Sequence, residues 1–302
     1  MGAHHHHHHH GADADARRLK IALALILGFM TVEVVAGIVA SSLALLSDAA
    51  HMLTDAGALA LALLAARLAR RPAGGGFTFG MRRAEILSAQ LNGATLLALG
   101  AVIVLEGVRR LIDPPDVEGG LVIAVAVAGI AVNLAATMVL SGANRRSLNV
   151  EGAFQHVLND LFAFIATAVA GVVVVTTGFT RADGIAALVV AALMIRSGVT
   201  LLRDSGRVLL EAAPRDLDPQ EIGRALVAAP HVVEVHDLHV WEVTSGFPAL
   251  SAHIVVQAGC DTQTHRRKLA LLLSERFGIE HSTLQVEAQP GGPIAIEPLS
   301  RA

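Results

Sequence analysis

Six long apolar segments, separated by short polar ones, occupy the first two thirds of this chain. They cover about residues 19–40, 41–66, 84–111, 119–140, 150–176 and 182–202. Each is close to the roughly 20 helical residues that span the hydrocarbon core of a bilayer. Glycine and proline, which break helices, mark the separators at 70–76 and 113–115. The pattern therefore predicts an all-α membrane domain, a six-helix transmembrane bundle over residues 19–204.

After residue 204 the pattern changes to shorter elements of mixed type. Asp218 and Pro219 are typical of a helix N-cap and first turn. The predicted elements are, in order, a helix at 218–226, strands at 232–243 and 249–257, a helix at 262–277 and a strand at about 282–288. The order αββαβ predicts a small α+β domain over residues 205–290, with its helices on one face of a sheet. Residues 291–302 follow as a tail.

Basic residues are distributed unevenly over the loops. One set of loops and ends holds Arg17, Arg18, Lys20, Arg67, Arg70, Arg71, Arg82, Arg83, Arg145, Arg146, Arg203 and Arg207. The opposite set holds only Arg109, Arg110 and Arg181. Because cytoplasmic loops carry an excess of Lys and Arg, both termini are predicted to face the cytoplasm. The first apolar segment has no cleavage site and further spans follow it, so a removable signal peptide is not expected.

Composition narrows the class of protein further. Hydrophobic residues make up 53% of the chain and charged residues 16%, which is too apolar for an ordinary soluble domain and predicts a multi-pass protein surrounded by lipid. The net charge of −3 gives no indication of a nucleic-acid surface. Cys260 is the only cysteine, which excludes an intrachain disulfide and a cysteine-based zinc site. The prevalence of Arg, Ala and Gly suggests a bacterial protein, hence one of the inner membrane.

The N-terminus carries a run of histidines from His4 to His10. It is interpreted either as a purification tag or as a natural His-rich, metal-binding tail. Both interpretations stay open, and residues 1–18 are left out of the argument about the fold.

Two His-x-x-x-Asp pairs stand inside otherwise apolar segments: His51 with Asp55, and His156 with Asp160. A spacing of four places both side chains of a pair on one helix face. Ionisable residues are costly at membrane depth, so each pair indicates function. Two such helices facing each other would offer two imidazoles and two carboxylates, a set that suits Zn²⁺ better than Mg²⁺ or Ca²⁺. The alternative interpretation is polar helix packing or a buried ion pair.

Three further acids lie in the predicted spans. Asp48, one turn before His51, is predicted to orient that imidazole or to line its aqueous access. Glu33 fits a helix-packing role and a proton-relay role equally well. Glu106 is predicted to form a local ion pair, because Arg109 and Arg110 follow it.

These motifs resemble those of the cation diffusion facilitator family of zinc transporters. The segments that carry the resemblance are SerAspAlaAlaHisMetLeuThrAsp (47–55), PheThrPheGlyMetArgArgAlaGluIleLeu (77–87) with Asn92, SerLeuAsnValGluGlyAlaPheGlnHisValLeuAsnAsp (147–160), ValHisAspLeuHisValTrp (235–241) and LeuSerAlaHis (250–253). The resemblance implies a proton-coupled antiporter, not an enzyme, that exports Zn²⁺ from the cytoplasm, with Cd²⁺, Co²⁺ or Fe²⁺ as alternatives. It also implies a homodimer with a ferredoxin-like, metal-binding cytoplasmic domain.

The resemblance also extends to single positions. His236, His253 and Glu287 match regulatory metal ligands of relatives, with His265 as a ligand of a neighbouring site. The alternative is that these histidines are structural. The chain departs from the family pattern at Asp183-Gly184, where proline usually follows the aspartate. It departs again at 161–166, whose bulky residues leave the close packing of that helix an open question.

Two other classes of function use the same residue types. A membrane metallohydrolase needs an open metal position and a general base, whereas four ligands would close the metal shell here. A metal sensor without transport needs only the soluble domain and would not need polar pairs inside the bilayer.

Overall fold

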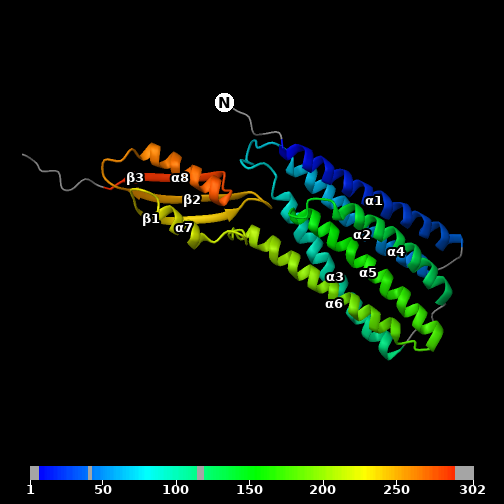
Figure 1. Ribbon diagram of the computed structural model, residues 1–302. Coiled ribbons are helices and arrows are strands. Elements are labelled where there is room, and N and C mark those ends of the chain that lie inside the picture. Colours follow the sequence, from blue (N-terminus) through cyan, green and yellow to red (C-terminus); the bar gives the residue numbers. More distant parts are fainter. Residues whose placement is uncertain (1–6, 40–42, 114–118, 290–302) are drawn as a thin grey trace, which may run out of the picture. The chain divides into compact units, whose positions relative to one another are not determined.

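The computed structural model describes residues 7–39, 43–113 and 119–289. The chain divides into two compact units, residues 1–206 and 207–302, and each is described by itself. The helices of the first unit are α1 (His7–Val39), α2 (Leu43–Ala69), α3 (Ala84–Ile112), α4 (Gly119–Ser141), α5 (Leu148–Thr177) and α6 (Ala182–Leu209) (Figure 1). The second unit holds α7 (Pro219–Val227), β1 (Val232–Glu242), β2 (Pro248–Val256), α8 (Thr262–Phe277) and β3 (His281–Ala288).

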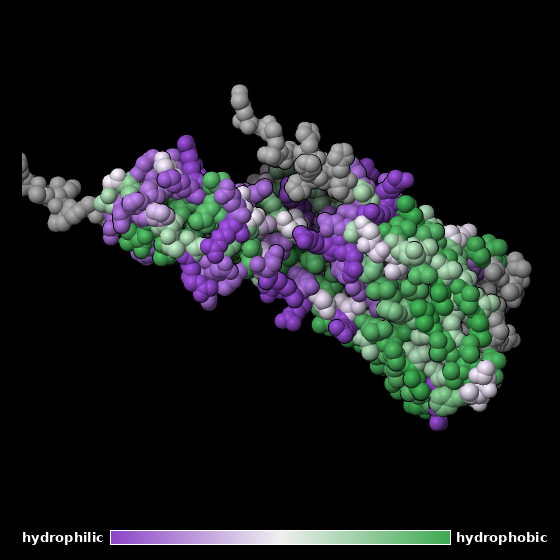
Figure 2. Space-filling view, viewed as in Figure 1, coloured by the Kyte–Doolittle hydropathy of each residue, from purple (hydrophilic) through white to green (hydrophobic). Residues whose placement is uncertain are grey.

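The helical unit has the surface of a membrane domain. In the described residues, α2 to α6 each contain a stretch long and apolar enough to cross a bilayer, and α1 precedes them. Large apolar side chains such as Leu105, Val127 and Met138 point outward. Figure 2 shows that apolar residues cover most of the visible face of this bundle. Such a surface is rare on soluble monomers and suits lipid, so the prediction of a helical transmembrane domain is confirmed.

Four helices, α1, α2, α4 and α5, share one core. On α1 the buried positions Leu19, Ala22, Ile26 and Phe29 recur every three or four residues, which places them on a single face. They pack against residues of α2, α4 and α5, namely Met52, Ala56, Leu59, Ala62, Ala136, Leu140, Ala153, Phe154 and Val157. The candidate metal ligands lie on helices of this core.

Glycines allow α3 and α6 to approach each other closely. Gly93, Gly100 and Gly107 recur every seven residues on α3, and a Cβ on any of them would press against α6 at 2.8–3.1 Å. On α6, a Cβ on Gly198 would lie 2.8 Å from the carbonyl oxygen of Gly93, and one on Gly184 would lie 3.0 Å from that of Gly107. The Asp183-Gly184 departure therefore has a packing role in this chain.

One bulky residue of the segment 161–166, Phe164, packs closely against neighbouring helices. The ring of Phe164 fills the space beside Gly129 of α4, where a Cβ would lie only 2.4 Å from the ring. The same ring makes an edge-to-face contact with Phe29 of α1, with 6.2 Å between the centroids. A glycine on the neighbouring helix thus accommodates the large side chain on α5.

Two helices are longer than the apolar pattern predicted. The helix α1 begins at His7 rather than near 19, and α6 continues to Leu209 rather than ending near 202. The extension of α1 is fixed by polar contacts: Asp13 pairs with Arg70, and Asp15 accepts a hydrogen bond of 2.9 Å from the backbone N–H of Asn144. A hydropathy pattern identifies only the apolar part of a helix, so it did not predict the polar turns at these helix ends.

The second unit is an α+β domain with the predicted element order αββαβ. Its sheet has the order β1-β2-β3, with β1 and β2 antiparallel and β2 and β3 parallel. The predicted cap is present, since Asp218 accepts a hydrogen bond from the backbone N–H of Gln220 at the start of α7. Alternate residues Leu250, Ala252, Ile254 and Val256 of β2 point into the core with side chains of α7 and α8. The intervening residues of β2, including His253, lie on the opposite face.

Candidate functional site

Three of the four predicted transmembrane ligands meet between α2 and α5. Asp55, His156 and Asp160 expose 3%, 0% and 6% of their surfaces. His156 Nε2 lies 2.8 Å from Asp55 Oδ1, and one ligand atom from each of the three residues lies within 4.8 Å of the others. The helix geometry explains the meeting: Asn149 donates to the carbonyl of Ala62, and the pair His156 and Asp55 lies two turns further along the same antiparallel contact.

Several of the nearest neighbours of this cluster along the two helices are apolar. Met52, Ala56 and Val157, which neighbour the ligands along the two helices, belong to the buried core. Two carboxylates in such a medium are strongly disfavoured as free anions and need a cation, protons or polar partners. An imidazole and two carboxylates are also common ligand types for zinc. The cluster can therefore hold a divalent cation or the protons that replace it.

The remaining predicted residues of the membrane domain differ in what the structure records. His51 and Asp48 belong to α2, but their side chains lie outside the described residues, so the four-ligand set stays a prediction. Glu33 is buried in α1 at 3% exposure, which fits both of its proposed roles. The predicted ion pair of Glu106 is confirmed, because Arg110 donates to Glu106 at 3.1 Å and also to Asp183 at 2.6 Å.

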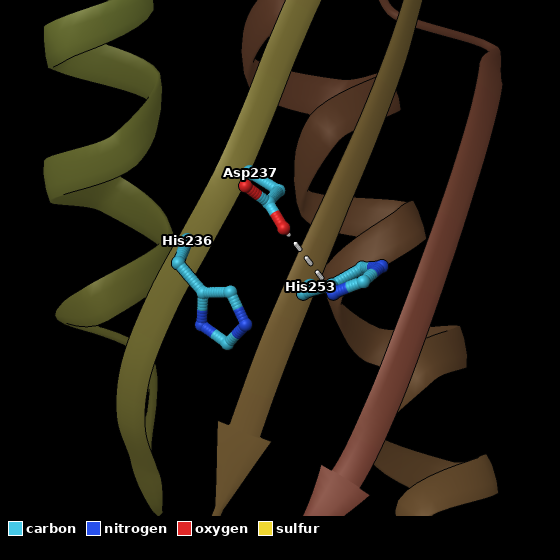
Figure 3. Close-up of side chains that lie close together, drawn as sticks. All are labelled: His236, Asp237 and His253. Carbon is cyan, nitrogen blue, oxygen red and sulfur yellow. Dashed lines mark ion pairs between the residues drawn. The ribbon is translucent and has the colours of Figure 1, made fainter.

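A second group of ligand types lies on the sheet of the smaller domain. His236 of β1 is the direct partner of His253 on β2, and their rings make an edge-to-face contact with centroids 5.3 Å apart. Figure 3 shows Asp237 above this pair, with an ion pair of 3.6 Å between its Oδ2 and His253 Nδ1. Ligand atoms of the three residues lie within 4.8 Å of one another. The group is more exposed than the transmembrane cluster and faces away from the domain core.

Sequence reasoning missed Asp237 because simple alternation assigns it to the face opposite His236. The structure has an irregularity between His236 and His239, where the pairing with β2 shifts register, and Asp237 adopts a positive φ of 49°. Asp tolerates this conformation better than most residues. A signal was present in the sequence: the inward-facing residues Val235, Leu238 and Val240 are spaced by three and then two, which breaks the strict alternation of a strand.

The structure does not bring Glu287 and His265 into this group. Glu287 is paired with Val255, whereas Gln285 is the β3 residue opposite His253. His265, in the first turns of α8, packs its ring against His231 with centroids 5.7 Å apart and donates from Nδ1 to the carbonyl of Asp261. Their metal-binding roles stay predictions.

Comparison with known proteins agrees with both halves of the chain. Residues 19–210 match the family model described as a cation efflux transmembrane domain, and residues 214–289 match that of a cation efflux protein, cytoplasmic domain. A solved structure of the metal-bound C-terminal domain of the CzcD transporter from Cupriavidus metallidurans is 33% identical. It covers 24% of this chain and 99% of its own, with a TM-score of 0.23.

Curated relatives are similar over most of their length. The zinc transporter ZitB of Escherichia coli is 41% identical over 87% of this chain and 84% of its own. The cadmium, cobalt and zinc/H(+)-K(+) antiporter of Bacillus subtilis is 37% identical over 88% of this chain and 86% of its own. The metal cation efflux system protein CzcD of Cupriavidus metallidurans is 40% identical over 87% and 83%. With a buried cluster of ligand types inside a matching transmembrane domain, this chain belongs to the cation efflux family of membrane transporters, and it is not an enzyme.

Proposed function

We propose that this protein exports a divalent cation, Zn²⁺ foremost, from the cytoplasm in exchange for protons. The site consists of His51, Asp55, His156 and Asp160. The observation that carries the proposal is the burial of Asp55, His156 and Asp160 in an apolar core with their ligand atoms within 4.8 Å of one another. The names of the relatives support Zn²⁺, with Cd²⁺ and Co²⁺ as further substrates, and Fe²⁺ stays an alternative from the ligand types.

The ligands themselves provide the coupling to protons. Metal binding needs neutral imidazoles and ionised carboxylates, so loading the site expels protons. Imidazole changes its charge within the physiological pH range, so His51 and His156 take protons back where the medium is more acidic. Protonation then releases the metal on the outer side, and the protonated site returns. Glu33, buried in the same bundle, is proposed to pass protons toward this site.

The orientation and the assembly belong to the same proposal. The excess of basic residues in one set of loops supports an orientation with both termini in the cytoplasm of a bacterial cell and the bundle in the inner membrane. The cytoplasmic-domain match supports a homodimer. Transport then requires the site to open alternately to the two sides, which in transporters is largely a rocking of helix bundles.

We also propose a regulatory metal site in the cytoplasmic domain, held by His236, His253 and Asp237. Two imidazoles and a carboxylate are suitable zinc ligands, and their partial exposure leaves room for exchange with the cytoplasm. Glu287 stays a candidate ligand of this site, and His265 stays a candidate ligand of a neighbouring one. A bound ion here would bias the conformational equilibrium of the protein, and only by its difference in affinity between the states.

Proteoliposomes with an imposed pH gradient test the transport proposal. The wild-type protein should transport Zn²⁺ in the direction opposite to the proton flow. Asp160→Ala should reduce this rate to background, because the substitution removes a charged ligand. The control is Glu106→Gln, which alters a half-exposed acid of α3 that pairs with Arg110 and should keep most of the transport. Transport by Asp160→Ala at the wild-type rate would show that the site is misassigned.

A further inference from the structure

Three buried polar side chains near the metal cluster have unsatisfied atoms. Ser88 Oγ, Asn92 Nδ2 and Asn149 Oδ1 are shielded from solvent and have no hydrogen-bond partner among the described residues. The residues expose 3%, 1% and 0% of their surfaces. An unsatisfied buried polar group costs about 1–3 kcal/mol, so three of them in one region need an explanation. Water or a passing ion is the usual one.

Two of these residues share a face of α3 with a carboxylate. Glu85, Ser88 and Asn92 are spaced by three and four residues, which aligns them along the helix. This face lies against α5: Ser147 donates to Glu85 at 3.2 Å, and a Cβ on Gly152 would lie 3.5 Å from Asn92 Nδ2. The missing side chain at Gly152 lets Asn92 approach α5 closely, and Leu201 Cδ2 lies 3.0 Å from the place that a Cβ would take.

The α5 helix gives the depth of each group. Gly152 precedes His156 by four residues and Ser147 precedes it by nine, so Asn92 and Glu85 lie about 6 Å and about 13 Å below the level of His156. Asn149 lies seven residues before His156 on the α2 side, where its Nδ2 donates to the carbonyl of Ala62. All these groups lie between the metal cluster and the end of the bundle that carries the α2–α3 and α4–α5 loops.

The polar line stops at the level of the cluster. The next residue on the same face of α3, Leu96, is fully buried and packs with Val190 and Met194 of α6. On this face of α3, the polar residues next to the level of the cluster lie on one side of it, toward the loops that the basic residues assign to the cytoplasm. The carboxylate of Glu85, at the loop end of this line, attracts cations. The hydroxyl of Ser88 and the amide of Asn92, closer to the cluster, can replace part of the water that surrounds a cation.

We propose that the seam between α2, α3 and α5 is a hydrated access path from the cytoplasm to the metal site, lined by Glu85, Ser88, Asn92 and Asn149. The inference rests on the proposed transport function and adds the residues by which the cation reaches its site. Asn92 of α3 lies about one helical turn below the level of His156 on α5. It is the last side chain that the ion passes before it reaches the site. It acts by positioning the partly hydrated cation and is not a ligand of the bound state.

The single cysteine of the chain allows a direct test of hydration. On a Cys260→Ser background, Ser88→Cys and Asn92→Cys should react with a small positively charged methanethiosulfonate added from the cytoplasmic side of vesicles. They should react at least tenfold faster than Ala89→Cys, which is equally buried beside Ser88. Equal rates for the three variants would overturn the path. This readout does not depend on transport, so it separates failure of the path from failure of the proposed function.

Transport kinetics give a second, independent measurement in the full-length protein. Asn92→Leu should lower the rate of Zn²⁺ uptake into inside-out vesicles at least tenfold and change equilibrium Zn²⁺ binding at the transmembrane site less than threefold. Asn92→Ser, which keeps a small polar side chain, should recover most of the rate. Uptake by Asn92→Leu at the wild-type rate, or an equal loss of binding and rate, would contradict a positioning role on the path.

Discussion

At the scale of single residues, the transmembrane cluster concentrates negative charge where the surrounding atoms cannot solvate it. Asp55 and Asp160 contribute two carboxylates, and His156 is the described side chain that contacts Asp55 directly, at 2.8 Å. A divalent cation satisfies this arrangement, and so do protons, but an empty ionised site does not. The same physical demand that would attract a metal supports the proposed exchange of the metal for protons.

In the cytoplasmic domain, single substitutions can test which carboxylate completes the proposed metal site. We expect Asp237→Asn to weaken Zn²⁺ binding by the domain at least tenfold, about 1.4 kcal/mol, because a charged ligand becomes a neutral amide. Asn also tolerates the positive φ at this position, so the backbone should be preserved. Calorimetric titration of the wild type and the variant measures the change.

The matched control is Glu287→Gln, which makes the same carboxylate-to-amide exchange on β3. Glu287 pairs with Val255 rather than with His253, so its substitution should change the affinity less than threefold. If Glu287→Gln abolishes binding and Asp237→Asn does not, Glu287 returns to the ligand set and Asp237 leaves it.

These positions show what a sequence can and cannot predict about a site. The pairs His51 with Asp55 and His156 with Asp160 are visible because helical spacing is regular and the flanking residues are apolar. The pairing of His236 with His253 follows from two adjacent strands. Asp237 was not predicted, because a local irregularity in β1 turns it toward the histidines. A prediction from strict strand alternation assumes that no such irregularity occurs.

At the scale of elements, glycine spacing determines how closely α3 and α6 pack. Gly198 of α6 approaches the backbone of Gly93, Gly184 approaches that of Gly107, and Gly100 makes room for the side chain of Ile195. Close backbone approach through small residues is a general way to join helices in lipid, where hydrophobic burial gives no advantage. Arg110 reinforces the pair near Gly107 and Gly184 by donating to Asp183.

We expect Gly198→Ala to destabilise the protein by about 1–3 kcal/mol, because the new methyl group would lie 2.8 Å from a backbone oxygen of α3. The loss should appear as a lower thermal unfolding midpoint in detergent. Gly28→Ala in α1 is the control, since a Cβ there meets nothing within 4 Å. That variant should be neutral or slightly stabilising through better helix propensity. An equal effect of the two substitutions would argue against close α3–α6 packing.

The turn between β1 and β2 contributes a pH dependence to the cytoplasmic domain. Burial raises the pKa of Glu242 above the ordinary value of 4.5, although its carboxylate accepts a hydrogen bond from the backbone N–H of Gly246. A raised pKa in the folded state means that the protonated form favours folding. The stabilisation is complete below pH 4.5 and is lost as the pH rises through the folded-state pKa.

Glu242→Gln should remove this part of the pH dependence. The thermal midpoint of the segment 206–302, compared between the wild type and the variant from pH 4 to pH 7, measures it. We expect the variant to gain stability relative to the wild type as the pH rises. A constant difference over this range would mean that Glu242 titrates with the same pKa in the folded and unfolded states.

At the scale of the whole molecule, each of the two units carries a proposed site for the same type of ion. The order of elements in both units was predicted from hydropathy and strand alternation, because the helices and strands of each unit bury an apolar face. The ends of α1 and α6 did not follow, since polar helical turns outside the membrane leave no apolar signal. The division into two units makes their separate contributions to transport measurable.

Removing the cytoplasmic metal site should modulate transport without abolishing it. In the isolated segment 206–302, Zn²⁺ that binds only the folded state adds RT ln(1 + [L]/Kd), about 2.7 kcal/mol at a hundredfold excess over Kd. His236→Ala with His253→Ala should remove that gain and leave the metal-free domain folded, because both side chains lie on the face away from its core. In the full protein the same pair should lower the apparent affinity for Zn²⁺ or the rate only modestly, because Asp55, His156 and Asp160 remain intact. Zinc uptake into proteoliposomes compares this variant with Asp160→Ala. If the two variants are equally inactive, the cytoplasmic histidines lie on the transport route itself and are not regulatory.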